Sequence, residues 1–455
     1  MDFVNILSTQ ASMSGVSFPD TWRVLPLYAI AKIKSICECT DLQLLSVYLD
    51  AGVVPFVTRT EKRTNATSKD LSKYQRVDEG DFVLNNQQAW RGSVGVSKYT
   101  GIVSPAYIVL SLNDALVPKY ADYLFRSDIM VNQYAVNSKG VGSIQRNLYW
   151  SSLKRVLVPV PMYDEQEKMV KFLDWKISKI NRLISVKKKQ IGLLIEQRQC
   201  IIDHAIFGGI SECKDDKDSG VFWIGKIPQT WDVLKIKWLF EEDNNRNDEE
   251  NAELLSFSRK KGLVPYSETS DKDPSASDLS KYRLVKPGQL LENRMQAWSG
   301  MFICVDKEGC VSPDYSVFNK RRERYVNVKF YEYVFRSPRQ VEQFANASRG
   351  IGNGFNRLYT PAFGSIYTVY PPKEEQDGVV DFLDKATSQF DLAISLKESQ
   401  IEVLHDLKKK LIHDVVTGQM NVENTIVPEF EFEDEIYDFE EDTYEVDEES
   451  TDEEV

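Results

Sequence analysis

Residues 164–207 have the sequence DEQEKMVKFLDWKISKINRLISVKKKQIGLLIEQRQCIIDHAIF. Apolar side chains recur there in a heptad, as in the seam of a coiled coil. With Val170 as the first a position, the a and d positions are Val170, Leu173, Ile177, Ile180, Ile184, Lys187, Ile191, Leu194, Arg198 and Ile201. Two cations interrupt an otherwise apolar seam, so the stretch predicts a long helix that packs against another helix.

The same seam returns 210 residues later, in residues 374–417. Its a and d positions are Val380, Leu383, Thr387, Phe390, Ile394, Lys397, Ile401, Leu404, Lys408 and Leu411, with cations at the same two places. Because a globular region connects the end of the first helix to the start of the second, we expect an antiparallel coiled coil. The seam cations either fix its register at a cost in stability or face a partner subunit, and we favour the first interpretation.

The regions before each helix are duplicated as well. The recurring phrases are Pro19-Asp-Thr21-Trp22 with Pro228-Gln-Thr230-Trp231, Ala89-Trp90-x-Gly92 with Ala297-Trp298-x-Gly300, Val103-Ser-Pro105-x-Tyr107 with Val311-Ser-Pro313-x-Tyr315, and Ser138-x-Gly140-x-Gly142 with Ser348-x-Gly350-x-Gly352. Solenoid repeats are only about 20 to 50 residues long. The longer period therefore indicates duplication of a whole domain together with its helix.

Each repeated module begins with short apolar or alternating runs, punctuated by glycine and proline, that predict strands. Aromatic residues at helical spacing predict helices over 120–134 and 330–344, and proline ends the last strands, 156–161 and 366–371. The predicted fold class is α+β, with two tandem α/β modules that are each followed by a long helix. The expected boundaries are 1–160 (first module), 161–210 (first helix), 211–372 (second module), 373–420 (second helix) and 421–455 (acidic tail).

The ends of the first long helix carry recognisable signals. Asp164 and Glu167 form a capping-box pattern at its start, which predicts Asp164 as the N-cap. Gly208-Gly209 is expected to end it.

The composition indicates a globular protein. Of its 455 residues 42% are hydrophobic and 27% charged, no apolar run approaches 18 residues, and the N-terminus lacks a signal-peptide pattern. We therefore expect a cytoplasmic protein. Six cysteines without a Cys-x-x-Cys pair, and only three histidines, predict free thiols and no metal site.

The net charge of −13 is unevenly distributed. Of the 69 acidic residues, 16 lie between Glu429 and Glu454, where no basic residue occurs, so 56 basic residues face 53 acidic ones elsewhere. The body is therefore mildly basic. The tail cannot form a core, and we expect disorder or a solubilising role. The alternative is an acidic decoy that occupies a basic groove until nucleic acid displaces it.

Two α/β modules, each closed by a Pro-x-x-x-Glu-Gln phrase (Pro161 to Gln166, Pro371 to Gln376) and a long helix, resemble the specificity subunit of type I restriction-modification systems. The phrase Gly225-Lys-Ile-Pro228-Gln-Thr-Trp231 is similar to the family's module opening. The first module departs from it, with a shortened Gly15-Val-Ser-Phe-Pro19. The resemblance covers residues 15–420.

The resemblance implies that each module is a target recognition domain that reads one half of an asymmetric, interrupted DNA site. The coiled coil would then set the spacer. It also implies two modification subunits that methylate adenine with S-adenosylmethionine, and restriction subunits that use ATP and Mg for translocation and cleavage. The chain itself would need no cofactor.

The sequence lacks the motifs of the partner activities. Its one Pro-Pro pair, in Tyr370-Pro371-Pro372-Lys373, has no preceding Asn or Asp to hold a flipped adenine, and no Gly-x-x-x-x-Gly-Lys-Ser/Thr motor motif occurs. We therefore expect a non-catalytic DNA-binding subunit without catalytic or metal-binding residues. The alternatives are the recognition subunit of another restriction-modification type, whose partner both methylates and cleaves, and an orphan two-headed scaffold.

Comparison of the modules separates two kinds of DNA-contact candidate. Cations present in both copies, beside the glycine turn, suit phosphate binding, although ordinary solvated cations remain an equal alternative. Polar residues that differ at aligned positions suit base reading, because amides pair with adenine and arginine with guanine. The candidates are Arg59, Lys62, Arg63, Gln87, Gln88, Arg91, Lys139, Arg146, Arg259, Lys260, Lys261, Arg294, Gln296, Arg349 and Arg357.

Four further residues are shared by the two copies. For Arg126 and Arg336 we favour a role in bracing the fold over contact with DNA. For Trp90 and Trp298 we favour the core over base stacking.

Overall fold

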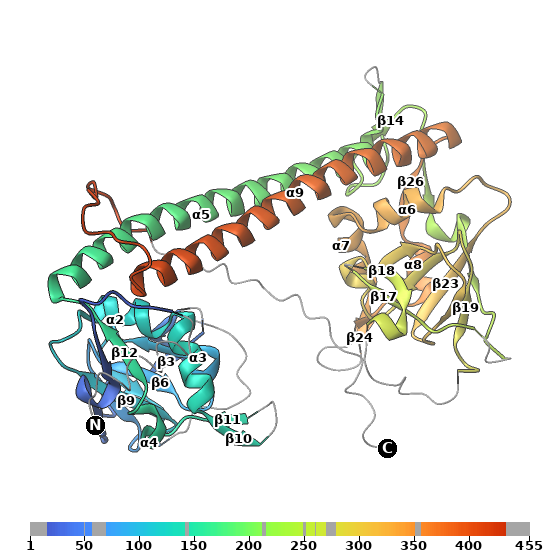
Figure 1. Ribbon diagram of the computed structural model, residues 1–455. Helices are drawn as coiled ribbons and strands as arrows, with labels where there is room; N and C mark the ends of the chain where they lie inside the picture. The colour runs from blue at the N-terminus through green and yellow to red at the C-terminus, as the bar shows by residue number, and fades with distance from the viewer. Residues whose placement is uncertain are drawn as a thin grey trace. The chain divides into compact units, whose positions relative to one another are not determined.

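The computed structural model describes residues 16–49, 51–56, 70–141, 145–211, 215–248, 252–259, 261–269, 279–350 and 356–433 (Figure 1). The chain divides into two compact units. Unit 1 is Met1–Lys188 with Glu398–Asp438, and unit 2 is Lys189–Lys397 with Phe439–Val455. Each unit contains one module and segments of both long helices.

The module of unit 1 is built on an antiparallel sheet of four strands. In spatial order these are β2 (Ala31–Lys34), β9 (Tyr107–Leu112), β6 (Phe82–Asn85) and β7 (Val94–Val96). Three antiparallel pairs accompany the sheet: β3 (Leu45–Tyr48) with β4 (Gly52–Pro55), β5 (Gln75–Val77) with β8 (Gly101–Val103), and β1 (Arg23–Pro26) with β12 (Leu157–Val160). The last strand predicted for 156–161 is thus confirmed as β12.

Alternating side chains of β6 serve two cores, as expected for a strand covered on both faces. Phe82 and Leu84 join the cluster formed with the helices, whereas Val83 joins a second cluster with residues of β3, β4 and β5. All three side chains are fully buried.

Helices and one hairpin complete the module of unit 1. They are α2 (Pro118–Phe125), α3 (Asp128–Asn137), the hairpin of β10 (Lys139–Val141) and β11 (Gln145–Asn147), and α4 (Trp150–Leu153). The prediction of one helix over 120–134 is wrong in its continuity. Buried Ser127, with φ −73° and ψ 153°, is extended and separates α2 from α3.

Unit 2 repeats this architecture. Its sheet runs β16 (Phe240–Asp243), β23 (Tyr315–Lys320), β20 (Leu290–Asn293) and β21 (Phe302–Cys304). The paired strands are β17 (Leu255–Ser258) with β18 (Gly262–Pro265), β19 (Arg283–Val285) with β22 (Gly309–Val311), β15 (Asp232–Lys235) with β26 (Tyr367–Tyr370), and β13 (Asp216–Asp218) with β14 (Lys226–Pro228). The remaining elements are α6 (Val328–Phe335), α7 (Pro338–Ala347), the hairpin of β24 (Arg349–Gly350) and β25 (Asn356–Arg357), and α8 (Thr360–Ser365).

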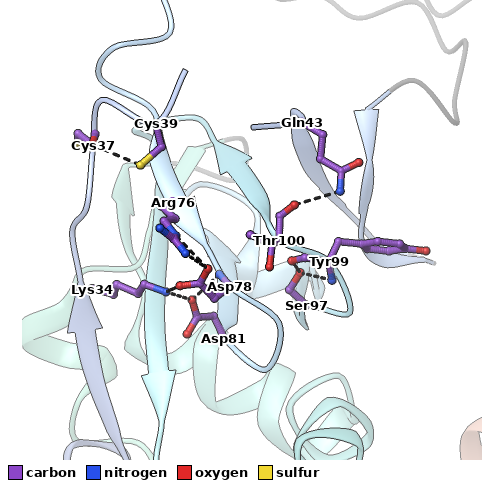
Figure 2. A network of polar contacts seen from close by, with 10 residues as sticks. All are labelled: Lys34, Cys37, Cys39, Gln43, Arg76, Asp78, Asp81, Ser97, Tyr99 and Thr100. Atoms are coloured by element: carbon purple, nitrogen blue, oxygen red, sulfur yellow. Dashed lines mark hydrogen bonds and ion pairs between the residues drawn. The ribbon is translucent and has the colours of Figure 1, made fainter. Parts of the chain in front are cut away.

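The polar residues at the edges of the two sheets, on β2 and β16, differ. At the edge of the unit 1 sheet, Lys34 Nζ donates to Asp78 Oδ2 at 2.6 Å and also to Asp81 (Figure 2). In unit 2, Asp243 occupies the strand position of Lys34, because Lys34 pairs with Val109 of β9 and Asp243 pairs with the equivalent Val317. Asp243 accepts a hydrogen bond from Gln289 at 2.9 Å. The residue at this strand position is a cation in unit 1 and an anion in unit 2, yet each takes part in a hydrogen-bond network at the edge of its sheet. We therefore assign both networks a role in stabilising the sheet edge.

The two long helices are α5 (Tyr163–Gly208) and α9 (Lys373–Val416). In unit 1, Lys187 Nζ donates to Gln400 Oε1 at 2.6 Å and Lys408 Nζ to Asn181 Oδ1 at 3.2 Å. Lys187 is bonded to Gln400, and Asn181, earlier on α5, is bonded to Lys408, later on α9. The helices therefore run antiparallel, as predicted.

Unit 2 contains the equivalent contacts, where the end of α5 lies beside the start of α9 (Figure 1). Lys397 Nζ donates to Gln190 Oε1 at 2.8 Å, and Arg198 Nε lies 3.4 Å from Asp391 Oδ1. All four seam cations are half-buried; the three lysines donate hydrogen bonds to the facing helix, and Arg198 forms an ion pair with it. These contacts support the register interpretation.

The Glu-Gln phrase joins the start of α5 to the module of unit 1. Gln166 is fully buried; its Oε1 accepts from Val117 N at 2.8 Å, and its Nε2 donates to Ala115 O and Pro161 O. Glu165 Oε1 accepts from Trp22 Nε1 at 3.0 Å. The phrase Pro-x-Thr-Trp and the phrase Glu-Gln are therefore bonded to each other.

Unit 2 makes the same connection. Gln376 accepts from Asn327 N at 2.9 Å and donates to Pro371 O, while Glu375 accepts from Trp231 Nε1 at 2.6 Å. These recurring phrases serve the fold.

The start of α5 corrects one prediction. Because α5 begins at Tyr163, Asp164 lies inside its first turn, and the prediction that Asp164 is the N-cap is wrong. A carboxylate in the first turn still interacts favourably with the helix dipole. The predicted end at Gly208-Gly209 is confirmed, since α5 ends at Gly208 and Gly209 has φ 67°.

The first part of the acidic tail is attached to unit 1. Val422 is buried in the core, and Ser178 Oγ both donates to Glu431 O and accepts from Glu433 N, each at 2.9 Å. Lys119 Nζ lies 4.3 Å from the centre of the Phe432 ring. The expectation of disorder is therefore wrong for residues 421–433, and residues 434–455 lie outside the described part of the chain.

Candidate nucleic-acid interface

In each module the shared Ala-Trp phrase forms a 3-10 turn. The turns are η3 (Ala89–Arg91) and η6 (Ala297–Ser299), and a left-handed glycine follows each, Gly92 with φ 103° and Gly300 with φ 82°. A side chain is disfavoured at such φ values, which explains why glycine occupies both positions.

A backbone hydrogen bond holds the chain that leaves each hairpin against the segment before the turn. Leu148 N donates to Asn86 O at 2.9 Å in unit 1, and Leu358 N to Arg294 O at 3.1 Å in unit 2. The hairpins are those predicted as glycine turns flanked by cations. Turn and hairpin together, here called the turn–hairpin site, therefore form one surface in each module.

In unit 1 the turn–hairpin site assembles several of the predicted residues. The guanidinium carbons of Arg91 and Arg146 lie 4.8 Å and 5.2 Å from the centre of the Trp90 ring. Gln87, Gln88 and Lys139 are exposed on the same segments. Cations held over an aromatic ring beside exposed amides suit contact with phosphates and base edges.

In unit 2 two arginines of the turn–hairpin site lie directly opposite each other. Arg349 and Arg357 are cross-strand partners of β24 and β25. Like charges at such positions are destabilising in the absence of an anion. Arg357 Nη2 lies 3.2 Å from Asp314 Oδ1, whereas Arg349 is exposed and is well placed to meet a phosphate.

Other predicted residues of unit 2 donate hydrogen bonds to backbone carbonyl oxygens of the protein itself. Arg294 donates through Nε to Asp314 O at 3.1 Å and through Nη2 to Pro313 O. Arg259 Nη2 donates to Ser299 O, which brings the β17–β18 turn to η6. Lys261 Nζ donates to Glu268 O at 3.0 Å. Gln296 is half-buried and lies directly before η6. Arg59, Lys62, Arg63 and Lys260 lie outside the described residues.

Arg126 and Arg336 brace the fold, as favoured from the sequence. Arg336 Nη1 donates to Glu332 Oε1 at 3.0 Å, and Glu332 Oε2 accepts from Cys304 N of the sheet at 2.9 Å. Asp122 links Arg126 to Val96 N in the same way. Each arginine thus neutralises a carboxylate that joins a helix to a strand.

The prediction that both tryptophans belong to the core is wrong. The Trp298 side chain is 47% exposed and Trp90 is only half-buried. Each indole N–H is used locally, by Gln87 O at 3.0 Å and by Met295 O at 2.8 Å. The glycine two residues after each tryptophan was the available signal, because a tight turn at the surface exposes the residue within it.

A buried carboxyl group lies near the same site in unit 2. Glu292 of β20 is fully buried, and among the described residues neither carboxyl oxygen has a hydrogen-bond partner. Burial raises the pKa of Glu292 to about 8, against a smaller opposing effect of Arg294. Sequence reasoning missed this residue because the strand period alone cannot assign a lone acid to the interior.

The chain is similar in sequence to known proteins. Residues 19–192 match the family described as Type I restriction modification DNA specificity domain. The chain is 22% identical, over 434 residues, to the type I restriction enzyme MjaVIII specificity subunit of Methanocaldococcus jannaschii, covering 90% of this chain and 96% of that protein. It is also 22% identical, over 383 residues, to the putative type I restriction enzyme MjaX specificity subunit of the same organism, covering 78% and 81%.

A solved structure shares the fold. A chain described under "Structural basis underlying complex assembly and conformational transition of the type I R-M system" superposes with a TM-score of 0.60 at 14% identity, covering 89% of this chain and 100% of that one. The duplicated α/β modules, each with a cationic turn–hairpin site and a long helix, share the fold of that chain. The region of residues 19–192 matches the type I restriction-modification specificity domain, and the whole chain is similar to specificity subunits of type I restriction enzymes.

Among the described residues, no helix combines the length and apolar composition needed to cross a lipid bilayer.

Proposed function

We propose that the two modules read the two halves of one bipartite, asymmetric DNA site. The observation that carries this proposal is the occurrence of the same turn–hairpin site in both modules with different side chains. Asn86 and Arg91 of the first module correspond to Arg294 and Ser299 of the second. Because base edges are distinguished by their hydrogen-bond donors and acceptors, different side chains on equal scaffolds favour different half-sites.

The long helices set the number of unread base pairs between the half-sites and bind two modification subunits. Cross-helix hydrogen bonds near the middle of α5 and α9 support a fixed register, which a molecular ruler requires. Apolar side chains that remain 50–66% exposed on α9 support the docking role, and they are Leu392, Leu396, Val403 and Leu407. Their spacing of 4, 7 and 4 residues places them on one helix face, as expected for a surface that receives another helix.

In this proposal the chain supplies recognition and the partners supply chemistry. Modification subunits bind S-adenosylmethionine and methylate adenine, and restriction subunits use ATP and Mg. The lack of methyltransferase and motor motifs in the sequence supports a non-catalytic role for this chain.

A domain exchange tests the proposal. The full chain is co-expressed with its methyltransferase partner, and methyladenine is mapped across the host genome. Replacing residues 18–160 by the first module of a relative is expected to change one half of a two-part motif and leave the other half unaltered. A change in both halves, or the absence of any motif with the unaltered chain, would overturn the proposal.

A further inference from the structure

Trp90 and Trp298 occupy the same place on the same scaffold and have different surroundings. Both indole N–H groups donate to the carbonyl oxygen three residues earlier, which fixes the ring and consumes its hydrogen-bond donor. The part of each side chain left for a ligand is therefore the ring face, and the two modules differ in what covers it.

In the first module two guanidinium groups cover the ring. Arg91 reaches it from the same turn and Arg146 from the hairpin, at 4.8 Å and 5.2 Å. A planar guanidinium stacked on an aromatic ring loses little freedom when it forms a further hydrogen bond. Trp90 thus holds two cations in place on an exposed surface.

In the second module the ring is open. Ser299 stands where the first module has Arg91, and Arg357 is directed to Asp314 at 3.2 Å. Of the cations that the structure describes, none lies over Trp298, and almost half of its side chain is exposed. Arg259 donates to the carbonyl oxygen of Ser299, the residue after Trp298, and exposed Arg349 lies on the hairpin of the same turn–hairpin site, so the site is positively charged.

We propose that Trp298 contacts DNA through its bare ring face, whereas Trp90 acts as a platform that presents Arg91 and Arg146 to phosphates and base edges. This inference rests on the proposed function of the modules. An apolar ring among cations fits the apolar parts of a duplex, such as deoxyribose and the thymine methyl group, flanked by phosphates. The first module makes its equivalent contact through charge.

The two kinds of contact differ in their dependence on salt. Replacement of a cation that binds phosphate lowers the slope of log affinity against log salt by about 0.9, because one fewer counterion is released. Loss of an aromatic contact lowers affinity at every salt concentration and leaves the slope unchanged.

The test uses the full chain and a fluorescent duplex that carries its mapped methylation motif, titrated between about 50 and 200 mM salt. Trp298→Ala is expected to weaken binding by on the order of 10-fold with an unchanged slope, and Trp298→Phe to restore most of the affinity. Arg91→Ala is expected to lower the slope by about 0.9. Trp238, 54% exposed on another 3-10 turn of unit 2, provides the matched control, and Trp238→Ala is expected to bind normally.

The outcomes are distinguishable. Unchanged affinity of Trp298→Ala, or a slope that falls as in Arg91→Ala, overturns this inference while the proposed function stands. A lack of binding by the unaltered chain overturns both. Thermal unfolding of each variant verifies folding, and Trp298 is exposed enough for replacement without loss of core packing.

Discussion

Lys187 of α5 and Gln400 of α9 are joined by a hydrogen bond of 2.6 Å, and Lys397 and Gln190 repeat it at 2.8 Å with the roles of the helices exchanged. Lys397 lies 210 residues after Lys187, and Gln400 lies 210 residues after Gln190, so one ancestral helix supplied both halves of each contact. A polar pair in an apolar seam penalises every shifted register, because a shift leaves the ammonium group against hydrocarbon.

A double-mutant cycle on this pair tests the register interpretation. Because the pair is partly exposed, Lys187→Ala and Gln400→Ala are each expected to lower the free energy of unfolding by only about 0.5–1 kcal/mol. The double variant is expected to lose less than the sum, because each single variant already loses the shared hydrogen bond. The measurement is urea unfolding of the full chain. Exposed Lys189 provides the control, and additive losses for Lys187 and Gln400 would show that the hydrogen bond contributes nothing.

Insertion of one heptad into both helices should lengthen the spacer. The insertions lie between Lys188 and Lys189 and between Glu398 and Ser399, opposite each other in the observed register. Seven residues add about 10 Å of helix, which corresponds to about three base pairs at ~3.4 Å each. Methyladenine mapping should find the same half-sites with a longer spacer. A heptad in α5 alone should abolish modification, because it shifts the seam.

The exposed hairpin cations should bind phosphate without reading bases. Arg349→Ala is expected to lower the salt slope of DNA binding by about 0.9. The methylated motif should stay the same, because phosphate contacts carry no sequence information. Fluorescence anisotropy at several salt concentrations measures the slope. Arg336, which pairs with Glu332, provides the contrast, since Arg336→Ala should reduce stability instead.

Glu292 should make unit 2 less stable as pH rises. Its pKa of about 8 in the folded chain exceeds the ordinary value of 4.5 because of burial, so unfolding releases a proton between these limits. Stability from this group is therefore fully present below pH 4.5 and is lost as pH approaches 8, by on the order of a few kcal/mol. Glu292→Gln should flatten the dependence of the unfolding midpoint on pH over this window. An equally steep dependence in the variant would contradict the assignment.

Leu84 provides the matched reference for this carboxyl group. It faces Ile108 across the strands of unit 1, as Glu292 faces Ser316 in unit 2. Glu292→Leu should therefore be tolerated and should raise the unfolding midpoint near pH 8.

Two truncations should separate the attached and acidic parts of the tail. Ending the chain after Glu433 retains the contacts with Ser178 and Asn181 and should leave the unfolding midpoint unchanged. Ending it after Asn421 removes buried Val422 and should cost about 2 kcal/mol. Thermal unfolding measures both, and equal midpoints would show that the attached segment contributes no stability.

The tertiary structure revised several details whose causes lie far apart in the chain. The helix predicted over 120–134 is interrupted at Ser127. Gln166 bonds backbone groups about 50 residues away, and Ser178 bonds the chain beyond residue 430. Such contacts leave no periodic trace in the sequence.

The duplication, the α+β class and the antiparallel helix pair could be predicted from the sequence, because heptads, strand alternation and repeated phrases are local or periodic signals. Which shared residues brace the fold and which reach the surface depends on contacts between residues far apart in the sequence, and is seen only in the folded chain. Trp90 and Trp298 share one motif, yet the ring is covered in one copy and open in the other. That difference depends on whether Arg91 or Ser299 follows, and on whether the hairpin arginine meets the ring or Asp314.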